Sequence, residues 1–465
     1  MNAAKMWGDE PYYGLGYDFD LQWVLTDAQK DLQERLIKVC HDVIRPEAIR
    51  CDETGDYPWK SVEALAELGL LGCIVPEKWG GRGENHVGLA MIGETITRYG
   101  CPSTGVIYMM HMAGLAALLY RAAGNEEILS LLRRLDSDVM VGSASFTDPE
   151  TGGHFWYPKI SGVEKVADGW KVMKKASFTT SCGHAKWVVA QTTSPDFDGN
   201  YANISDFLIY ADEMTCDPGL WDVMGMRATI SGPVEIDTVL PENRLIGAPG
   251  DGAPSNDEAV NAVAMIMYGA LYNGIALSAL DLARRYTTRR RHAQYGQAVS
   301  DYQITHDTYG HAMIETQASR FFTYGLCQQL DRVTDNGDWA MYETDPEVRL
   351  RTPYIWWGIA AKEKACRVAS ETADSMFHLF GGAAYSRRQE IERVLRDSKA
   401  GWIMGPTNEV ARGIVGRWAL GGYQAVDWWN QKVNEGLLNS ELGKLDADGK
   451  RAIIAKLNAE LGEKG

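Results

Sequence analysis

The sequence predicts an α+β protein in which a helical unit, a β unit and a second helical unit follow one another. Three observations support this prediction. Apolar residues recur at helical spacing between about residues 25 and 135, short β-type runs occupy 141–245, and long helical stripes return after about residue 257. A chain of 465 residues, 45% of them hydrophobic, is long enough to bury a large core in two or three such units.

The first unit, assigned to residues 1–140, is predicted to be helical because its apolar residues fall on single helix faces. Glycine-rich breaks separate these stripes, as expected between short helices. The stripes are Leu32, Leu36 and Val39, then Val62, Leu65, Leu68 and Leu71.

The second unit, assigned to residues 141–247, has the texture of strands. The runs KWVVAQT, DFLIYA and PVEIDTV are rich in β-branched and aromatic residues and are separated by clusters of Gly, Asp, Asn and Pro. We therefore expect a compact β unit inserted between two helical ones.

The third unit, assigned to residues 248–422, carries longer helical stripes, which predict a helix bundle. Residues 423–465 form a C-terminal extension whose last helix is amphipathic through Ile453, Ile454, Leu457 and Leu461. We expect that helix to dock on the body of the protein or on a neighbouring subunit. The stripes of the bundle are Ile275, Ala279, Leu282 and Tyr286, then Ala365, Ala369, Ala373, Met376 and Phe377.

Composition excludes several kinds of partner. The formal charge of −16 disfavours nucleic acid and anionic membranes, which bind through basic patches. No export signal or membrane-spanning run is expected, and the eight widely spaced cysteines, without any C-x-x-C pair, indicate buried thiols in a reducing cytoplasm. We expect no metal site, and no G-x-G-x-x-G follows a strand to indicate a nicotinamide site.

Five segments, in order along the chain, resemble the acyl-CoA dehydrogenase family as far as about Gly422. They are ELGLLGCIVPEKWGGRG, SFTDPETGG (like T-E-P-x-A-G-S), SFTTSCGHAKWVV (like W-I-T-N-G-x-A), MGMRATISGPVEIDTVLPENRLIG and HLFGGAAYSRRQEIERVLRDSKAGWIMGPT. The resemblance implies an N-terminal helical domain, a middle β-barrel domain, a C-terminal four-helix bundle and an FAD cofactor.

The β unit supplies residue types that suit a flavin. An isoalloxazine ring needs hydrogen-bond donors at its edge and a flat wall against one face. By resemblance Phe146 and Thr147 belong to the cofactor site, Thr180 contacts the flavin edge with Thr147, and Phe178 takes the place of the usual Trp. The alternative is that these are ordinary strand residues chosen for β propensity.

The resemblance also places residues at the other end of FAD. The Gly381-Gly382 turn, from a neighbouring subunit, would meet the adenosine, with His378 in place of the usual Gln. Arg291 is the expected partner of the pyrophosphate, although YTTRRRHAQYGQ puts His292 at the family's offset. The alternatives are a tight helix terminus and a solvated basic helix end.

The family's usual catalytic base is missing. In the alignment with the family's Y-E-G-T stretch, Gly405 takes the place of the Glu, Pro406 that of the Gly and Thr407 that of the Thr. The resemblance also makes Thr407 a residue of the cofactor site. The second place where relatives carry a base aligns with Ala264. The nearest upstream acid, Glu258, is about 9 Å away along a helix axis.

Two features soften this loss. Gly405 keeps the backbone N–H that could polarise a thioester oxygen, and Glu409 lies four residues later as a weak candidate base. The alternative for Glu409 is the first turn of a helix that opens at Pro406. Tyr268, one turn beyond Ala264, could face the ligand, but an ordinary phenol is a poor base at neutral pH.

Three functions follow as hypotheses. The first is α,β-dehydrogenation of an acyl-CoA with a relocated base and transfer of electrons to an electron-transfer flavoprotein. The second is diverged flavin chemistry at a CoA thioester: oxidase, monooxygenase or C–S cleavage. The third is a base-less FAD-binding subunit of a hetero-oligomer; otherwise we expect a homo-oligomer, either dimer or tetramer. The runs GVIYMMHMAG and TPYIWWGIA form either an acyl pocket or plain core.

Overall fold

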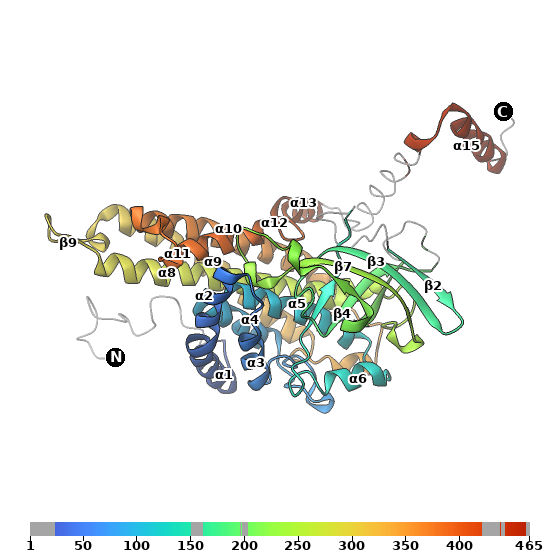
Figure 1. The fold of residues 1–465 in the computed structure, drawn as a ribbon, viewed down its shortest axis with the longest axis horizontal. Helices are drawn as coiled ribbons and strands as arrows, with labels where there is room; N and C mark the ends of the chain where they lie inside the picture. Colours follow the sequence, from blue (N-terminus) through green and yellow to red (C-terminus); the bar gives the residue numbers. More distant parts are fainter. Residues whose placement is uncertain are drawn as a thin grey trace.

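The computed structural model describes residues 24–149, 161–195, 197, 203–420, 438 and 442–461. Within these ranges, helices come first, two small sheets follow, and long helices complete the body of the protein (Figure 1). The order helical, β, helical predicted from the sequence is confirmed.

The N-terminal part is a cluster of helices. Thr26 begins the first helix with a capping box, because its hydroxyl accepts the Gln29 N–H while the Gln29 side chain accepts the Thr26 N–H. The elements are α1 (Asp27–Val39), η4 (Cys40–Ile44), α2 (Arg45–Thr54), α3 (Trp59–Glu67), α4 (His86–Thr95), η6 (Ile96–Gly100), α5 (Pro102–Tyr120) and α6 (Glu126–Leu132).

The middle part consists of two sheets whose inner faces share a hydrophobic core. One sheet has the order β1-β4-β5, with β1 parallel to β4, and the other has the order β2-β3-β7-β6 and is antiparallel. Among the described strands the ladders remain two sheets and do not close into one continuous barrel. The strands are β1 (Gly142–Ser145), β2 (Gly162–Val166), β3 (Gly169–Thr179), β4 (Trp187–Thr193), β5 (Ile204–Tyr210), β6 (Thr215–Cys216) and β7 (Gly232–Leu240).

The C-terminal part is built on three long helices, α8, α9 and α10, with α11 against α8 and α10 as the fourth. In Figure 1 the far ends of α8 and α9 project beyond the rest of the body and are joined by the β8–β9 hairpin. The elements are α7 (Gly252–Ser255), η11 (Asn256–Val260), α8 (Asn261–Arg289), β8 (Arg291–His292), β9 (Gln297–Ala298), α9 (Gln303–Val333), α10 (Ile355–Leu379), η15 (Gly381–Tyr385), α11 (Glu390–Ser398), α12 (Ala400–Ile403) and α13 (Asn408–Ala419).

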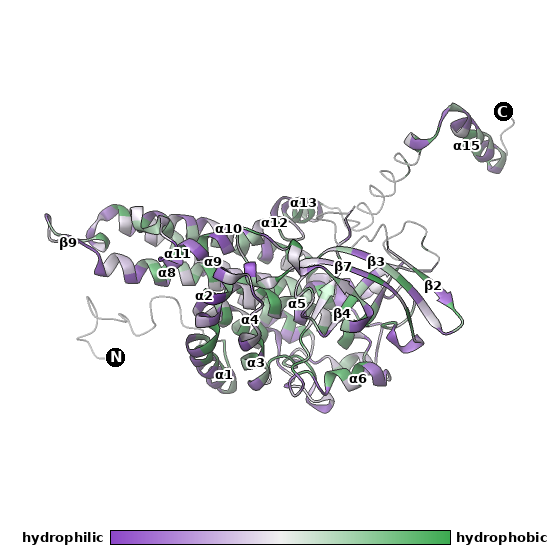
Figure 2. Cartoon of the chain, in the orientation of Figure 1, coloured by the Kyte–Doolittle hydropathy of each residue, from purple (hydrophilic) through white to green (hydrophobic). Residues whose placement is uncertain are grey.

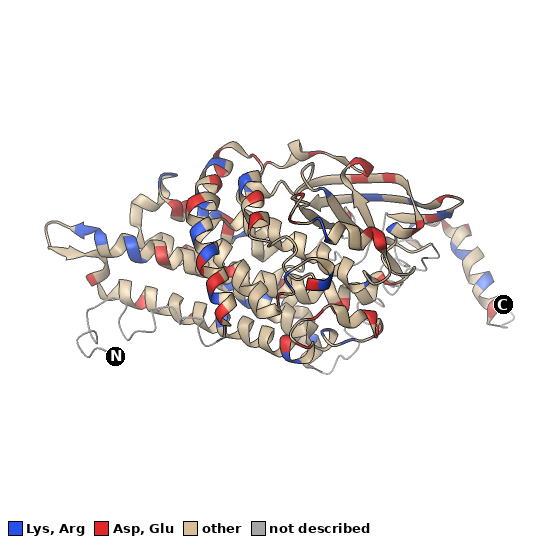
Figure 3. Ribbon diagram, turned by 90° about the horizontal axis from the view of Figure 1, so that it is seen from below, with Lys and Arg blue, Asp and Glu red and all other residues tan. Residues whose placement is uncertain are grey.

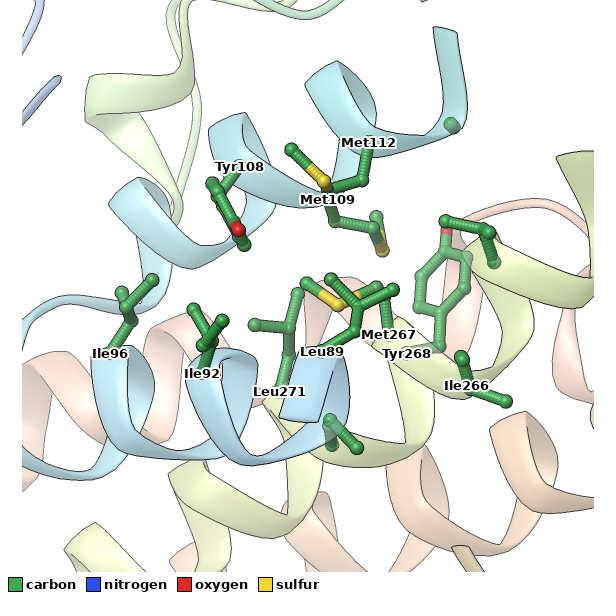
Figure 4. Close-up of a cluster of buried hydrophobic side chains, with 14 of the residues drawn as sticks. Leu89, Ile92, Ile96, Tyr108, Met109, Met112, Ile266, Met267, Tyr268 and Leu271 are labelled. Atoms are coloured by element: carbon green, nitrogen blue, oxygen red, sulfur yellow. The ribbon is translucent and has the colours of Figure 1, made fainter. Parts of the chain in front are cut away.

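The main core lies where α4, α5 and α8 meet. Figure 4 shows Leu89 and Ile92 of α4 facing Met109 of α5 and Met267 and Leu271 of α8. The run Gly105–Gly114 predicted to be pocket or core is buried here except for the partly buried Met110. Figure 2 shows the same apolar character along α5.

Two helical stretches, Pro102–Tyr120 and Gly252–Arg289, are long and apolar enough to cross a membrane. Their most apolar windows are 94% and 100% buried inside the protein. They are therefore core helices of this fold.

The surface mixes both signs of charge. Figure 3 shows Lys and Arg interspersed with Asp and Glu over the described elements. The last helix, α15 (Ala447–Glu460), buries none of its residues, and Ile454, Leu457 and Leu461 are more than half exposed. The expected docking of this helix on the body of the same chain is therefore wrong, and docking on a neighbouring subunit stays a prediction.

Candidate active site

Two segments predicted to meet a flavin are in direct contact although 31 residues separate them. The Thr147 hydroxyl follows β1 and donates to the Phe178 carbonyl at 3.0 Å, while the Phe178 N–H donates to that hydroxyl at 3.2 Å. Phe146, the residue before, is buried against the main core. The end of β1 and the end of β3 thus form one surface.

That surface carries an uncovered aromatic ring beside buried hydroxyl groups. Phe178 is 61% exposed, and its ring meets Trp221 edge-on at 6.4 Å. Thr180 is buried, and its hydroxyl lies 3.0 Å from the Ser231 hydroxyl. The Ser231 hydroxyl in turn lies 2.9 Å from the Thr229 hydroxyl. An open flat ring and hydroxyl donors are what an isoalloxazine requires, so these residues fit the group.

Two adjacent residues of α11, Arg396 and Asp397, fix the segment that precedes β7. The Asp397 carboxylate accepts the Met226 N–H at 2.6 Å. Arg396 is bidentate to Asp52 of α2, at 2.7 and 2.9 Å, and also donates to the Met224 carbonyl. Burial raises the pKa of Asp397 to about 6. These contacts hold the β unit, α2 and the bundle together around the site.

Arg291 lies on the exposed β8–β9 hairpin. It donates through Nη1 to the Gly296 carbonyl at 3.3 Å, and its neighbour His292 lies 2.8 Å from the Tyr302 hydroxyl through Nδ1. Arg291 is the first residue of β8 and directly follows Arg290, the C-cap residue of α8.

The Gly381-Gly382 turn is open at the surface. Gly381 has φ +58°, which favours glycine, and a Cβ built at either residue would meet no atom within 4 Å. Neither residue is restricted by packing within this chain, so another group can approach the turn closely. His378, on the last turn of α10, is also exposed.

The loop that contains Gly405 joins α12 to α13. Gly405 and Thr407 are partly buried, and the Thr407 hydroxyl caps α13 by accepting the Val410 N–H at 3.4 Å. The helix begins at Asn408, so the prediction that Pro406 is its first residue is wrong. Helix entry depends on the Thr407 hydroxyl, which satisfies one of the free N–H groups of the first turn.

Glu409 lies in the first turn of α13, as one of its two interpretations expected, and its side chain is 59% exposed. It accepts the Trp402 indole N–H at 2.8 Å and pairs with Arg412 at 3.1 Å. The Trp402 hydrogen bond and the Arg412 guanidinium hold the pKa of Glu409 below its usual range. A carboxylate placed in this way is a weak base.

The second family position offers no base either. Ala264 and Met265 lie on α8, and Tyr268 follows one turn later, stacked on Tyr272 with ring centroids 6.3 Å apart. Burial raises the pKa of Tyr268 above its ordinary value, so the phenol keeps its proton at neutral pH.

Glu258 is occupied elsewhere. Its carboxylate is fully buried in η11 and accepts the backbone N–H groups of Leu350, Arg351 and Thr352 at 2.9 to 3.1 Å, together with the Tyr342 hydroxyl at 2.8 Å. It organises the turn before α10 and is not available as a base.

The structure adds two residues that the sequence did not single out. Ser231 bridges Thr180 and Thr229, and only its place in the matched segment MGMRATISGP could have marked it. Lys362, on α10, contacts both ends of the loop around Gly405. No local pattern distinguishes that lysine from a surface lysine.

Comparisons with known proteins identify the family of this chain. The family model of the acyl-CoA dehydrogenase N-terminal domain matches residues 26–133, and the model of the C-terminal domain matches residues 262–420. Together they match more than half of the chain. The chain belongs to the acyl-CoA dehydrogenase family; it is a flavin-dependent oxidoreductase whose cofactor is FAD.

The relatives are distant and varied. A probable acyl-CoA dehydrogenase, YngJ of Bacillus subtilis (strain 168), is 26% identical, with 86% of this chain and all of that protein covered. A 3-sulfinopropanoyl-CoA desulfinase of Paraburkholderia xenovorans (strain LB400) is 24% identical, with 85% of this chain and 97% of that protein covered.

Solved structures share the fold. A glutaryl-coenzyme A dehydrogenase in complex with glutaryl-CoA superposes with a TM-score of 0.75 at 22% identity, covering 86% of this chain and 97% of that one. PigA, solved with FAD and proline, superposes with a TM-score of 0.72 at 18% identity, covering 85% of this chain and 98% of that one.

Proposed function

We propose that this protein is an FAD-dependent oxidoreductase that acts on a CoA thioester. The observation that carries the proposal is the joined Thr147–Phe178 surface with the buried Thr180 hydroxyl beside it. It combines hydrogen-bond donors with an uncovered aromatic wall, and the family relationship supports the same cofactor.

In this proposal the flavin end of FAD contacts Thr147 and Thr180, and Phe178 covers one face of its ring next to Phe146. Arg291 pairs with the pyrophosphate, since a guanidinium is suited to phosphate oxygens. FAD, when bound, supplies the hydride-accepting chemistry of the reaction. In the same proposal Thr407 contacts the cofactor; in the structure its hydroxyl caps the start of α13.

At the adenosine end, Gly381, Gly382 and His378 come from a neighbouring subunit. The open space around both glycines supports this arrangement, because a partner molecule can reach their backbone. The protein is accordingly proposed to be a homo-oligomer, dimer or tetramer.

At the reacting end, the Gly405 N–H donates to the thioester oxygen. A backbone donor held in a partly buried loop stabilises negative charge on that oxygen. Polarisation of the thioester is thus separated in this chain from removal of the α proton, for which Gly405 and Ala264 offer no group.

The first candidate reaction is α,β-dehydrogenation with a relocated base, with Glu409 as the base and an electron-transfer flavoprotein as acceptor in the cytoplasm. A specific observation favours a second candidate, diverged flavin chemistry at the thioester. Glu409 is bound to Trp402 and Arg412 at the surface, and Glu258 is locked in the core. A base-less subunit of a hetero-oligomer is the third.

An anaerobic titration tests the proposal. The purified protein is mixed with acyl-CoAs of different chain length, branching and ring content while flavin absorbance is followed. Dehydrogenation bleaches the flavin, and Glu409→Gln should then abolish the bleaching if Glu409 is the base. Gly413→Ala, on the same helix, is the control because a Cβ there meets no atom within 4 Å and the Glu409 contacts stay in place.

Each outcome assigns one of the candidates. A flavin whose spectrum shifts with thioesters but stays oxidised excludes dehydrogenation, and oxygen uptake with product analysis then identifies diverged chemistry. If the protein binds FAD but no thioester changes its flavin spectrum, the proposal that this chain acts by itself is contradicted. Co-purification with a related chain would then indicate the helper subunit.

A further inference from the structure

A fully buried lysine lies under the loop that carries Gly405. Lys362 projects from α10, and its side chain has no solvent exposure. Its Nζ donates to the Gly401 carbonyl at 2.8 Å and to Asn408 Oδ1 at 2.9 Å. Its third side is closed by the Tyr268 ring, whose centroid is 5.5 Å away.

The two acceptors mark the two ends of one loop. Gly401 belongs to α12, Asn408 is the first residue of α13, and Gly405 lies between them. One ammonium group therefore fixes both ends of the segment. Because the acceptors lie 39 and 46 residues away from Lys362 in sequence, the contact ties α10 to the loop and is not part of helix geometry.

The rest of the loop is seated on the same side. A Cβ at Gly401 would come within 2.4 Å of the Tyr272 ring and 2.8 Å of the Cys366 sulfur, so only glycine lets the backbone lie flat there. Asn408 also donates through Nδ2 to the Glu363 carbonyl at 3.5 Å. The loop thus rests on α8 and α10 with little freedom.

Burial of the Lys362 ammonium group in this space costs free energy, because the group loses its hydration. Burial lowers the pKa of Lys362, and the more distant groups Cys366, Glu363 and Glu409 oppose that shift only in part. The hydrogen-bond partners are neutral, so no carboxylate offsets the loss of hydration through direct contact. An apolar side chain would fill the volume more cheaply but would leave the Gly401 carbonyl and the Asn408 amide without this donor.

We propose that Lys362 is a positioning residue that holds the Gly401–Asn408 loop and thereby directs the Gly405 N–H at the thioester oxygen. The loop contact stands on geometry alone, while its effect on the thioester rests on the proposed function. An oxyanion donor is effective only when it is held in place before the reaction. Lys362 supplies that restraint from beneath the loop.

Hydrogen–deuterium exchange of the FAD-loaded protein tests the restraint. Lys362→Met removes the donor, and exchange of peptides covering residues 401–408 should rise by about tenfold or more as the loop opens locally. Lys362→Gln keeps a shorter, neutral amide donor and should restore part of the protection. Lys364→Met is the control, because that lysine pairs with Glu315 on the other side of α10.

If Lys362→Met does not fold, Asn408→Ala removes one of the two acceptors while keeping the lysine, and the same peptides report the result. Unchanged exchange in a folded Lys362→Met or Asn408→Ala protein overturns the inference. This outcome does not depend on any substrate.

A second readout concerns the thioester. Acetyl-CoA labelled with carbon-13 at the carbonyl serves as the probe, and its bound resonance should move downfield in the native protein because the carbonyl is polarised. In Lys362→Met the resonance should return toward its free position, and Lys364→Met should not alter it. No binding to the native protein counts against the proposed function, whereas binding with an equal shift in both proteins counts against Lys362.

Discussion

Gly405 and Ala264 are the two positions that the resemblance of the sequence aligns with the usual catalytic base of the acyl-CoA dehydrogenase family. Gly405 offers a backbone N–H and no carboxylate, and Ala264 offers only a methyl group. The nearby phenol of Tyr268 stays protonated because burial raises its pKa. On the proposed function, a site with these residues stabilises negative charge on the thioester oxygen but has no group that removes the α proton.

Restoring a carboxylate is the direct test of this interpretation. In Ala264→Glu the new side chain extends from α8, and bleaching of the flavin by a thioester that binds should accelerate by about 10²-fold or more, the usual contribution of a general base. Ala264→Gln has the same shape without the base and should remain as slow as the native protein. Equal rates for Glu and Gln would show that proton removal is not what this site lacks.

A buried histidine gives the fold a dependence on pH. His111 of α5 donates through Nε2 to the Leu71 carbonyl at 2.8 Å, and its Nδ1 accepts the Gly142 N–H at 2.8 Å. The Nδ1 contact requires the neutral ring, because a protonated Nδ1 cannot accept a hydrogen bond. Burial lowers the pKa of His111 to about 4 in the folded protein, from an ordinary value of 6.5.

Stability linked to His111 is complete above pH ~6.5 and is lost as the pH falls toward ~4, because the unfolded chain takes up the proton first. The loss should amount to about 3 kcal/mol over that interval. Urea unfolding of the native protein and of His111→Gln at several pH values measures it. The variant should be less stable at neutral pH yet less sensitive to acid, and parallel curves would contradict the assignment.

Among elements, the crossing of α8 over η6 depends on one glycine. A Cβ at Gly274 would lie 2.0 Å from the Thr97 hydroxyl and 2.5 Å from the Glu94 carbonyl. That hydroxyl donates to the Leu271 carbonyl at 2.8 Å, so it cannot turn away without losing a buried hydrogen bond. The helices are close because no side chain separates them.

Gly274→Ala should therefore destabilise the protein by about 1–3 kcal/mol, since overpacking outweighs the gain in helix propensity. Gly310→Ala on α9 is the matched control. A Cβ at Gly310 meets no atom within 4 Å, so that substitution should stabilise by up to ~1 kcal/mol. Chemical unfolding measures the free energy of unfolding of both variants. A Gly274→Ala protein as stable as the control would refute the steric account.

The elements were largely predictable from the sequence because their signals are local. The runs KWVVAQT, DFLIYA and PVEIDTV overlap β4, β5 and β7, and the apolar stripes lie on helices except for Leu68 and Leu71, which follow the end of α3. Contacts between distant segments were not predictable. Neither the Lys362 contacts nor the Glu258 contacts with the turn before α10 leave a periodic or spacing signal, since each joins residues at least 39 apart.

At the scale of the whole molecule, the proposed cofactor site is divided between two regions of the surface. The flavin-edge residues lie on the β unit, whereas Gly381 and Gly382 lie in the open turn after α10. Within the described part of the chain, no hydrogen bond or ion pair joins these two groups. An assembly in which the turn of one subunit meets the FAD of the next would unite them, and exposed apolar side chains such as Ile304 and Ile314 on α9 provide surface for it.

Disrupting that surface should remove the cofactor as well as the assembly. Ile304 and Ile314 are 70% and 68% exposed, so Ile304→Lys/Ile314→Lys places two charges on α9 without disturbing the core. Sedimentation velocity should show a smaller species, and gel filtration should strip FAD from it because the neighbouring turn is lost. Val239→Lys, a charge added at a half-exposed site on β7, should keep both mass and flavin. A double variant that becomes monomeric yet retains FAD would place the whole cofactor site within one chain and exclude a contribution from the partner's Gly381-Gly382 turn.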